Sequence, residues 1–338
     1  MILVTGATGL IGSYLLFELA QKENVVKALA RDTFSTAHVQ KLFTYLDPQQ
    51  GEAYYKKIEW VKGDVLDIQS LAHALQDVAY VYHCAGFVSF NDRDLPMLLK
   101  VNASGTANVV NLCLEKKIKK LCHISSVASL GQPENGQPLS EKSFWKTSKK
   151  NSAYAVSKYN GEREVWRGIE EGLDAVIVNP SVVIGAFFKQ NNINKFFQTL
   201  KKFKAYHTSG VNGFVDVRDV ANSMILLMES PITGERFIIN GENSAFEKLM
   251  LAGCKALGKP QKSTLIPNGL IKVGVGALAL KDIVFPSHNM VSARGLQYLT
   301  EKTFYSSDKF KAAFPDFVFT PLEESIQFAF ELLKKQEN

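Results

Sequence analysis

One glycine-rich segment at the start of the chain constrains the fold more than any other feature. The apolar residues 1–4 are followed directly by Thr5-Gly6-Ala7-Thr8-Gly9-Leu10-Ile11-Gly12. The apolar run predicts a buried parallel strand, and the leucines after the glycines predict a helix. Gly6 permits a tight turn, Gly9 lets the backbone approach a pyrophosphate, and Gly12 lets the helix pack closely on the sheet. The helix amino end would offer free N–H groups to phosphate, so this turn predicts a dinucleotide site made by Gly6, Thr8, Gly9, Leu10, Ile11 and Gly12.

Strand and helix patterns alternate through the first 180 residues. This alternation predicts βαβ units and therefore an α/β fold, a Rossmann-type doubly wound parallel sheet with helices on both faces. Right-handed crossovers place the carboxyl ends of all strands at one edge, where ligands of such sheets bind. We expect strands at 2–4, 25–30, 58–62, 79–84, 120–124 and 174–178, and helices at 10–22, 36–46, 68–76, 95–117 and 152–171.

The pattern loosens after residue 180 and predicts a second domain. Residues 214–230 suggest a short strand that leads into a helix, and 235–239 suggest another strand. We expect both segments to return to the first domain. The nucleotide-binding domain would then consist of 1–180 and 214–240, and a smaller, discontinuous, mostly helical substrate domain of 181–213 and 241–338.

Composition sets the class of protein and its partners. The chain has 338 residues, of which 46% are hydrophobic, so a sizeable core is available. Its four cysteines have no metal-ligand spacing, so we expect no metal site and a reducing compartment. The net charge is +6, with lysines clustered at 116–120, 146–150 and 195–204, either for an anionic ligand or as solvated surface. Nothing suggests nucleic-acid binding.

Two observations predict a cytoplasmic protein with no membrane partner. A strand that begins at residue 2 leaves no room for a signal peptide. The most apolar long stretch, 264–285, is interrupted by Lys272, Lys281 and Asp282. A stretch broken in this way is too short for a membrane span.

Tyr154 and Lys158 predict acid–base chemistry. Four residues apart on a helix, they share one face and lie one turn from each other. A phenol with a pKa near 10 exchanges protons poorly at neutral pH, but a fixed ammonium nearby favours the phenolate and lowers that pKa. The pair could then exchange a proton with an alcohol or carbonyl oxygen.

Two further polar positions complete the candidate site. Ser125 and Ser126 follow the strand at 120–124, at the edge where a cofactor would lie, and a hydroxyl there could stabilise charge on a substrate oxygen. Asn102 falls inside the helix at 95–117. It could hold a proton relay toward Lys158, or kink the helix, or meet solvent.

The order of these motifs resembles the extended short-chain dehydrogenase/reductase family. Its blocks are Thr-Gly-x-x-Gly-x-x-Gly at 5–12, Gly-Asp-Val at 63–65, His-Cys-Ala-Gly at 83–86, Ser-Ser at 125–126 and Tyr-x-x-Ser-Lys at 154–158. The segments 179–185 and 214–221 resemble later blocks of the family. The resemblance covers most of the chain.

This resemblance implies a role for each matching residue. Tyr154 would be the catalytic acid–base group, Lys158 would lower its pKa and bind the nicotinamide ribose, and Ser126 would orient the substrate oxygen. Counting back from Gly131 aligns Ser126 rather than Ser125 with the family's hydroxyl. Asn102 joins this catalytic group as the relay candidate. Further cofactor contacts would come from Asp64, Val65, Ala85, Gly86 and Pro180.

The end of the second strand distinguishes the two nicotinamide dinucleotides. An acidic residue there binds the ribose 2′-hydroxyl of NAD, whereas an arginine accommodates the 2′-phosphate of NADP. Arg31 is the first polar residue after the strand, so NADP(H) is favoured. The adjacent Asp32 keeps NAD(H) open.

Within the family, 28–32 and 179–185 are similar to dihydroflavonol reductase-like and 3β-hydroxysteroid dehydrogenase-like members. This similarity implies NADPH-dependent reduction of a ketone or aldehyde, with a small carbonyl or alcohol compound as substrate. A nucleotide-sugar epimerase that uses NAD is the alternative, for which Asn179, Lys189 and Arg218 could hold a diphosphate. A sensor without turnover is a second alternative, disfavoured by the intact tyrosine–lysine pair. Dehydration is disfavoured because Val127 and Ala128 stand where an acidic pair is expected.

Substrate contacts and assembly are predicted more coarsely. Phe144 and Trp145, just before Tyr154 in the chain, could roof an apolar substrate, and Phe187 could add to the pocket together with Phe188, Phe196 and Phe197. Helices 95–117 and 152–171 form the dimer contact in many family members, so the resemblance implies a homodimer.

Overall fold

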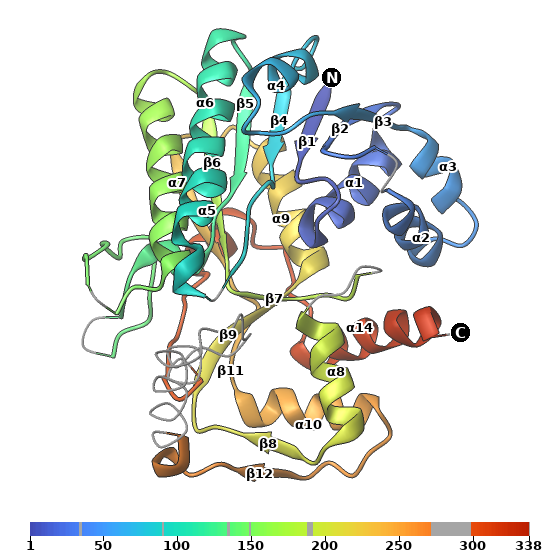
Figure 1. Ribbon diagram of the computed structural model, residues 1–338, viewed down its shortest axis with the longest axis vertical. Coiled ribbons are helices and arrows are strands. Elements are labelled where there is room, and N and C mark those ends of the chain that lie inside the picture. Colours follow the sequence, from blue (N-terminus) through green and yellow to red (C-terminus); the bar gives the residue numbers. More distant parts are fainter. Residues whose placement is uncertain are drawn as a thin grey trace.

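The computed structural model describes residues 1–33, 36–89, 91–133, 136–148, 150–187, 192–271 and 299–337. Its largest element is a seven-stranded parallel sheet with the strand order β10-β6-β5-β4-β1-β2-β3 (Figure 1). The order reverses between β1 and β4, which makes the carboxyl ends of these two strands the expected ligand edge. The strands are β1 (Ile2–Thr5), β2 (Val26–Ala30), β3 (Ile58–Lys62), β4 (Tyr80–His83), β5 (Lys120–Ile124), β6 (Ala175–Pro180) and β10 (Glu235–Ile239).

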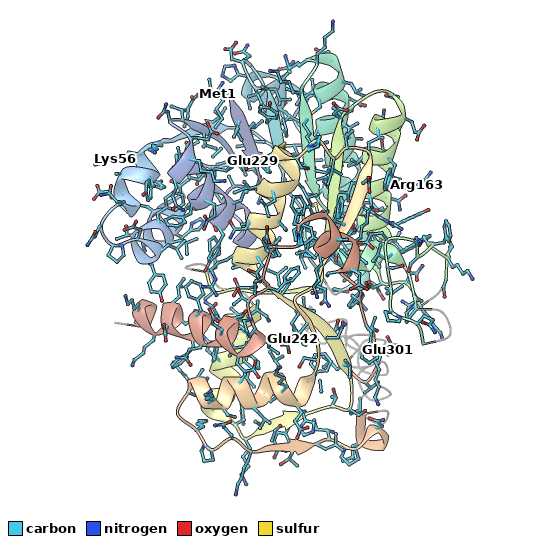
Figure 2. The ribbon with its side chains drawn as sticks, turned by 180° about the vertical axis from the view of Figure 1, so that it is seen from behind. Met1, Lys56, Arg163, Glu229, Glu242 and Glu301 are labelled. Atoms are coloured by element: carbon cyan, nitrogen blue, oxygen red, sulfur yellow. The ribbon has the colours of Figure 1, made fainter. Side chains whose placement is uncertain are left out.

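Helices cover both faces of this sheet and bury an apolar layer on each. One face packs mainly against α1 (Leu10–Lys22), α2 (Ala37–Leu46) and α9 (Val217–Glu229). The other packs against α4 (Ile68–Ala74), α6 (Gly105–Glu115) and α7 (Ala153–Glu170). Seen from behind, Lys56 of α3 (Gly51–Lys56) and Arg163 of α7 lie on opposite flanks of this large lobe (Figure 2).

A smaller lobe lies beyond the carboxyl edge of the sheet (Figure 1). It contains a three-stranded sheet in the order β11-β9-β7 and a two-stranded sheet of β12 and β8. Its elements are β7 (Val182–Ile184), α8 (Asn192–Lys202), β8 (Ala205–His207), β9 (Val211–Asp216), β11 (Glu242–Ala245), α10 (Phe246–Ala256), β12 (Ser263–Leu265) and α14 (Leu322–Glu337).

The predicted elements of the first 180 residues are confirmed to within about two residues at most ends, with one informative exception. The helix expected at 95–117 is divided into α5 (Leu95–Leu99), a π-helical turn (Lys100–Ser104) and α6. Asn102 occupies the π-helical turn, a feature that is frequent at functional sites.

The segments after residue 180 divide between the two lobes. The strand expected at 235–239 is β10 and pairs with β6 in the large sheet, while α9 packs on α1. The strand before α9 is longer than expected and belongs instead to the three-stranded sheet, because β9 pairs with β7 and β11. The short helix α13 (Asp308–Ala313) returns from the small lobe to β10.

No helix among the described residues is long and apolar enough to cross a membrane. Most of the apolar stretch at 264–285 lies outside these residues, because 272–298 are not described.

Candidate active site

The glycine-rich turn joins β1 to α1 with very little space around it. Gly6 has φ +64°, and a Cβ atom there would lie 2.4 Å from the backbone carbon of Cys84, just after β4. A Cβ on Gly12 would lie 2.3 Å from the Gly6 carbonyl oxygen. The Gly9 N–H donates to the same oxygen at 2.9 Å, which closes the turn directly before α1. The amino end of α1 therefore faces the switch point between β1 and β4.

A buried hydrogen-bond chain supports this turn from below. The Thr5 hydroxyl lies 2.7 Å from Nδ1 of His83 and accepts from the Ala85 N–H at 3.2 Å. Nε2 of His83 lies 3.0 Å from the hydroxyl of Thr106 on α6. Burial lowers the pKa of His83 to about 3, so its imidazole is neutral and has one donor and one acceptor. The chain joins β1, β4 and α6 beneath the turn.

The remaining predicted cofactor residues lie along the same edge. Arg31 is exposed directly after β2. Asp64 accepts from the Leu66 N–H through its carboxylate at 3.0 Å, which shapes the segment after β3. The carbonyl of Val65 accepts from the Asn108 amide at 2.9 Å, so this segment is tied to α6. Thr8, Leu10 and Ile11 are half-buried in the turn and at the start of α1. Ala85 and the exposed Gly86 follow β4, and Pro180 is the last residue of β6.

Lys158 is buried at the centre of the site. Its ammonium donates to the Ile124 carbonyl at the end of β5 at 2.8 Å, and a Cβ on Gly86 would lie 4.0 Å from its Nζ. Burial lowers the pKa of Lys158 to about 8, although Glu162 and Cys84 oppose the shift. Burial also lowers the pKa of the neighbouring His123 well below its usual value, so the two histidines beneath Lys158 are neutral. In the buried cluster of Lys158, His83 and His123, the positive charge is therefore on the Lys158 ammonium.

Tyr154 lies one turn before Lys158 on α7 and is half-buried. The side chain of Ser152 caps this helix by accepting from the Ala155 N–H at 3.1 Å. Tyr154 therefore belongs to the first turn of a firmly capped helix, on the face that carries Lys158.

The two adjacent serines have different surroundings. Ser125 is 5% exposed, and its hydroxyl donates to the carboxylate of Glu162 at 2.8 Å. Ser126 is half-buried, and its hydroxyl accepts from the Ala128 N–H at 3.2 Å. The hydroxyl of Ser126 thus accepts one hydrogen bond and still has a proton to donate, whereas the hydroxyl of Ser125 already donates its proton to Glu162.

Asn102 is held on both sides of its amide. Its Nδ2 donates to the Phe87 carbonyl and to the Ser157 hydroxyl, each at 2.9 Å, and its Oδ1 accepts from the Phe87 N–H at 2.7 Å. It is 3% exposed. Of the three interpretations drawn from the sequence, contact with solvent does not occur. The amide ties the segment after β4 to the helix that carries Tyr154 and Lys158.

The predicted substrate residues lie in different environments. Trp145 stacks on Tyr159 of α7, with ring centroids 4.3 Å apart, whereas Phe144 is 83% exposed. Phe187 is buried, with its ring edge-on to His38 at 5.0 Å. Among the other phenylalanines considered, Phe197 is buried in the core, Phe196 is packed against it, and Phe188 lies outside the described residues.

The sequence analysis did not identify Glu162 and Arg236. Glu162 is 2% exposed and receives hydrogen bonds from five side chains, one of them Arg236 on β10. Glu162 lies four residues after Lys158, on the same helical face as the predicted pair. That spacing was the available signal for it, whereas Arg236 is brought close only by the pairing of β10 with β6.

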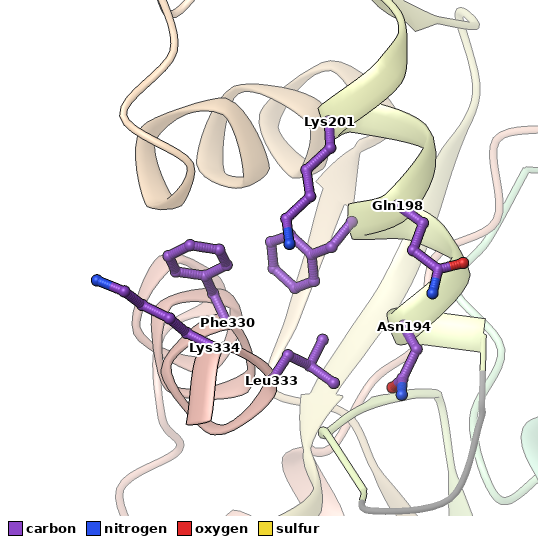
Figure 3. Close-up of a pocket in the computed structure, with 7 residues that line it drawn as sticks. Asn194, Gln198, Lys201, Phe330, Leu333 and Lys334 are labelled. Carbon is purple, nitrogen blue, oxygen red and sulfur yellow. The ribbon is translucent and has the colours of Figure 1, made fainter. Parts of the chain in front are cut away.

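A small cavity of about 170 Å³ lies away from these residues, between α8 and α14 (Figure 3). Phe197, Phe330, Leu333 and the lysines Lys201 and Lys334 contribute to its wall. None of the predicted catalytic or cofactor residues lines it. Within the described ranges, no group of three or more His, Cys, Asp or Glu side chains could hold a metal ion.

Comparison with known proteins agrees with this architecture. The model of the NAD dependent epimerase/dehydratase family matches residues 2–240. A putative dihydroflavonol 4-reductase from Synechocystis sp. is 29% identical over 273 residues, which cover 78% of this chain and 74% of the relative. The solved structure of gox2253 is 26% identical, with a TM-score of 0.80 and coverage of 99% of this chain and 98% of that one. A UDP-glucose 4-epimerase from Thermotoga maritima shares the fold, with a TM-score of 0.76, coverage of 100% of this chain and 99% of that one, and 18% identity.

The fold and these matches define an NAD(P)-dependent enzyme. The chain belongs to the NAD dependent epimerase/dehydratase family, within the extended short-chain dehydrogenases/reductases. The residues at the switch point fit a dinucleotide, because α1 begins at the turn with N–H groups that have no partner within the helix. The close contacts of Gly6 and Gly12 keep side chains out of that space.

A Gly12→Ala variant tests whether the turn must remain this compact. The added Cβ would lie 2.3 Å from the Gly6 oxygen, so α1 must move away from the turn. We expect cofactor affinity to fall about tenfold or more and stability to fall by about 1–3 kcal/mol, as for an overpacked site. Fluorescence titration and urea unfolding measure the two effects.

The matched control is Gly172→Ala. Gly172 has φ +97°, and a Cβ there would meet no described atom within 4 Å, so alanine is strained without a clash. This control should lose about 1 kcal/mol of stability and keep its cofactor affinity. Equal affinities for the Gly12 variant and the parent would contradict the role given to the turn.

Proposed function

We propose that this enzyme reduces a ketone or aldehyde with NADPH as the favoured cofactor. The observation that carries the proposal is the difference between the two serines at the end of β5. The Ser126 hydroxyl accepts from the Ala128 N–H and keeps its proton available to donate, while the Ser125 hydroxyl donates to Glu162. A carbonyl oxygen held at this edge would meet two hydroxyl donors and a nearby ammonium, which is the arrangement that carbonyl reduction requires.

Each residue then has a distinct task. The dihydronicotinamide ring, when bound, supplies the hydride that the carbonyl carbon accepts. Ser126 holds the carbonyl oxygen, and Tyr154 donates its phenolic proton to that oxygen as negative charge develops. Lys158 favours the resulting phenolate electrostatically, because an opposite charge nearby stabilises the charged form. Orientation of the three groups contributes much of the rate.

Asn102 is proposed to position this group. Through Phe87 it fixes the segment that follows β4, and through Ser157 it contacts the residue before Lys158. A relay that runs through Asn102 toward Lys158 remains a proposal.

An apolar substrate is favoured by the segment before α7. Trp145 is half-buried against Tyr159, and the exposed Phe144 precedes it. We propose that this segment covers the substrate when it binds, with Phe187 contributing from the small lobe. The similarity to a putative dihydroflavonol 4-reductase from Synechocystis sp. supports a reductase.

Epimerisation of a nucleotide sugar is the second candidate, and the described contacts weigh against it. The Asn179 amide donates to the Ser126 carbonyl, Ser129 and Glu162 within the protein. Arg218 forms a two-point ion pair with Asp216, and its guanidinium lies 4.0 Å from the ring centre of Phe328. Two of the three groups considered for a diphosphate are thus engaged elsewhere, and Lys189 lies outside the described residues.

The homodimer and the cytoplasmic location stay predictions. Family resemblance implies that α5, α6 and α7 form the dimer contact. On the outer side of these helices, Arg167 of α7 pairs with Glu164 and Glu171 and donates to Asn111 of α6, which gives a polar surface. The substrate is a small molecule, as in the family.

The central test is turnover with a panel of ketones, aldehydes and sugar nucleotides, followed at the nicotinamide absorbance band. We expect oxidation of NADPH with a carbonyl compound. A Tyr154→Phe variant should lose roughly 10²–10⁴-fold in kcat because the proton donor is gone, and should keep its cofactor affinity. Tyr159→Phe, on the next face of the helix, is the matched control and should keep its turnover.

Three results would argue against a reductase. Tightly retained NAD with conversion of a sugar nucleotide and no net absorbance change would indicate an epimerase. Cofactor binding without turnover of any compound would indicate a sensor. A Tyr154→Phe variant with the turnover of the parent would remove the proposed mechanism.

Cofactor preference is tested at the end of β2. If Arg31 binds the 2′-phosphate, Arg31→Ala should weaken NADPH binding about tenfold, because a charge-assisted hydrogen bond is lost. NADH lacks this phosphate and serves as the internal control, with an affinity that changes little. Equal losses for both cofactors, measured by fluorescence titration, would contradict the preference for NADPH.

The lowered pKa of Lys158 predicts a pH dependence. The ammonium is present below pH about 8 and is lost as the pH rises through that value, because burial has moved the pKa down from its ordinary value. The pH profile of kcat/KM for the cofactor reports groups of the free enzyme. We therefore expect kcat/KM to fall above about pH 8. In Lys158→Arg the guanidinium stays charged, so this alkaline limb should move to higher pH, where loss of the Tyr154 proton sets it, even if the overall rate is lower.

A further inference from the structure

We infer that the buried ion pair of Glu162 and Arg236 positions the proposed catalytic serine and the proposed substrate loop together. Two segments are involved, the serine turn, residues 126–131, and the substrate loop, residues 141–146. The inference rests on the proposed function and assigns positioning roles to two residues outside the proposed catalytic group.

Glu162 holds the serine turn from inside the protein. One carboxylate oxygen, Oε2, accepts hydrogen bonds from Ser125 at 2.8 Å, Ser129 at 2.6 Å and Asn179 at 2.8 Å. Asn179 also donates to the Ser126 carbonyl at 3.1 Å, and the hydroxyl of Ser129 lies 2.8 Å from the same carbonyl. The backbone of Ser126 is therefore fixed through groups that converge on Glu162, and none of these groups occupies the Ser126 hydroxyl.

Arg236 holds the substrate loop from the neighbouring strand. Its Nη2 donates to the carbonyls of Glu141 at 2.7 Å and Ser143 at 2.8 Å, and its Nε donates to the former at 3.1 Å. The Glu141 carboxylate in turn accepts from the Ile238 N–H at 2.8 Å. The start of the loop is thereby fastened to β10, just before the exposed Phe144 and the stacked Trp145.

The ion pair connects the contacts of Glu162 with the serine turn to the contacts of Arg236 with the substrate loop. Nη1 of Arg236 donates to Oε1 of Glu162 at 3.0 Å, and the two side chains are 17% and 3% exposed. Burial alone would raise the pKa of Glu162, but Arg236 and the hydrogen bonds from Ser129, Asn179 and Ser125 lower it below its ordinary value. Glu162 is thus ionised, and each partner depends on the other, because breaking a buried pair leaves an uncompensated charge.

The two segments also meet directly. A Cβ on Gly131, at the end of the serine turn, would lie 3.4 Å from the Phe144 carbonyl oxygen and 3.4 Å from Trp145 Cα. A displacement of either segment would therefore reach the other. The ion pair lies behind this contact and sets the distance between the hydroxyl that orients the carbonyl and the loop that covers the rest of the substrate.

The first measurement is amide hydrogen exchange of the cofactor-free protein, which requires no substrate. Glu162→Gln keeps the shape of the side chain but presents an amide donor to either Arg236 or the serine cluster. Arg236→Lys keeps the charge but cannot hold two loop carbonyls and Glu162 at once. We expect each variant to raise exchange in both segments. Two results would overturn the inference. One is increased exchange only in the segment that the substituted residue contacts, and the other is unchanged exchange in both segments.

The second measurement is steady-state kinetics with the carbonyl compound that the panel identifies. We expect Glu162→Gln to lower kcat about tenfold or more with KM within about twofold, because the serine hydroxyl is displaced. Arg236→Lys should raise KM about fivefold and retain most of kcat, because ordering of the loop contributes to substrate binding. If the two residues have a purely structural role, the variants should contain less folded protein, while kcat per cofactor-binding site and KM stay unchanged. That result would also overturn the inference.

The controls separate this effect from general loosening. Glu235 precedes Arg236 on β10 and forms an ion pair with Lys309 of α13, with 2.7 Å between Oε2 and Nζ. Glu235→Gln removes this ion pair and should alter neither segment. If Glu162→Gln does not fold, Ser129→Ala removes one hydrogen bond to the same carboxylate, and the same two outcomes decide the test. If no carbonyl compound is reduced by the parent enzyme, the proposed function fails, whereas the exchange experiment still decides whether the two segments are coupled.

Discussion

The site depends on the very close approach of two backbone segments at the switch point of the sheet. The turn after β1 passes the end of β4 so closely that any side chain at Gly6 would overlap the backbone of Cys84. The same turn leaves no room for a side chain at Gly12, where α1 begins. This compactness directs the amino end of α1 toward the cofactor edge. The buried chain through Thr5, His83 and Thr106 then fixes β4 and α6 relative to it.

Burial of charge organises the rest of the site. The two histidines beneath Lys158 are neutral because desolvation lowers their pKa values. Lys158 itself is buried on a backbone carbonyl, whereas Glu162, one turn further along α7, stays ionised because Arg236 and several hydrogen bonds compensate its burial. One helix face therefore presents a half-buried phenol, an ammonium and a carboxylate in succession. In the proposed mechanism the first two act on the substrate, whereas the third accepts hydrogen bonds from Ser125, the serine turn and Arg236.

The sequence predicted the large sheet well because its strands are mostly apolar segments with clear breaks between them. It predicted Tyr154 and Lys158 because a spacing of four on a helix defines a shared face without any tertiary information. The π-helical turn at Asn102 was not predicted, since its widened geometry depends on contacts with Phe87 and Ser157. The additional strands of the small lobe were missed because they are short, three to six residues, and pair with partners far along the chain.

The sequence by itself determined the fold class and located the glycine-rich turn and the candidate acid–base pair, because these follow from local spacing and from the steric freedom of glycine. Only the tertiary structure distinguished the surroundings of Ser125 from those of Ser126, since both are serines at the end of one strand and differ only in what packs behind them. It also brought Glu162 together with Arg236, which are 74 residues apart in the sequence. Their contact depends on the pairing of β10 with β6 and on how α7 lies across the sheet, which no local pattern specifies.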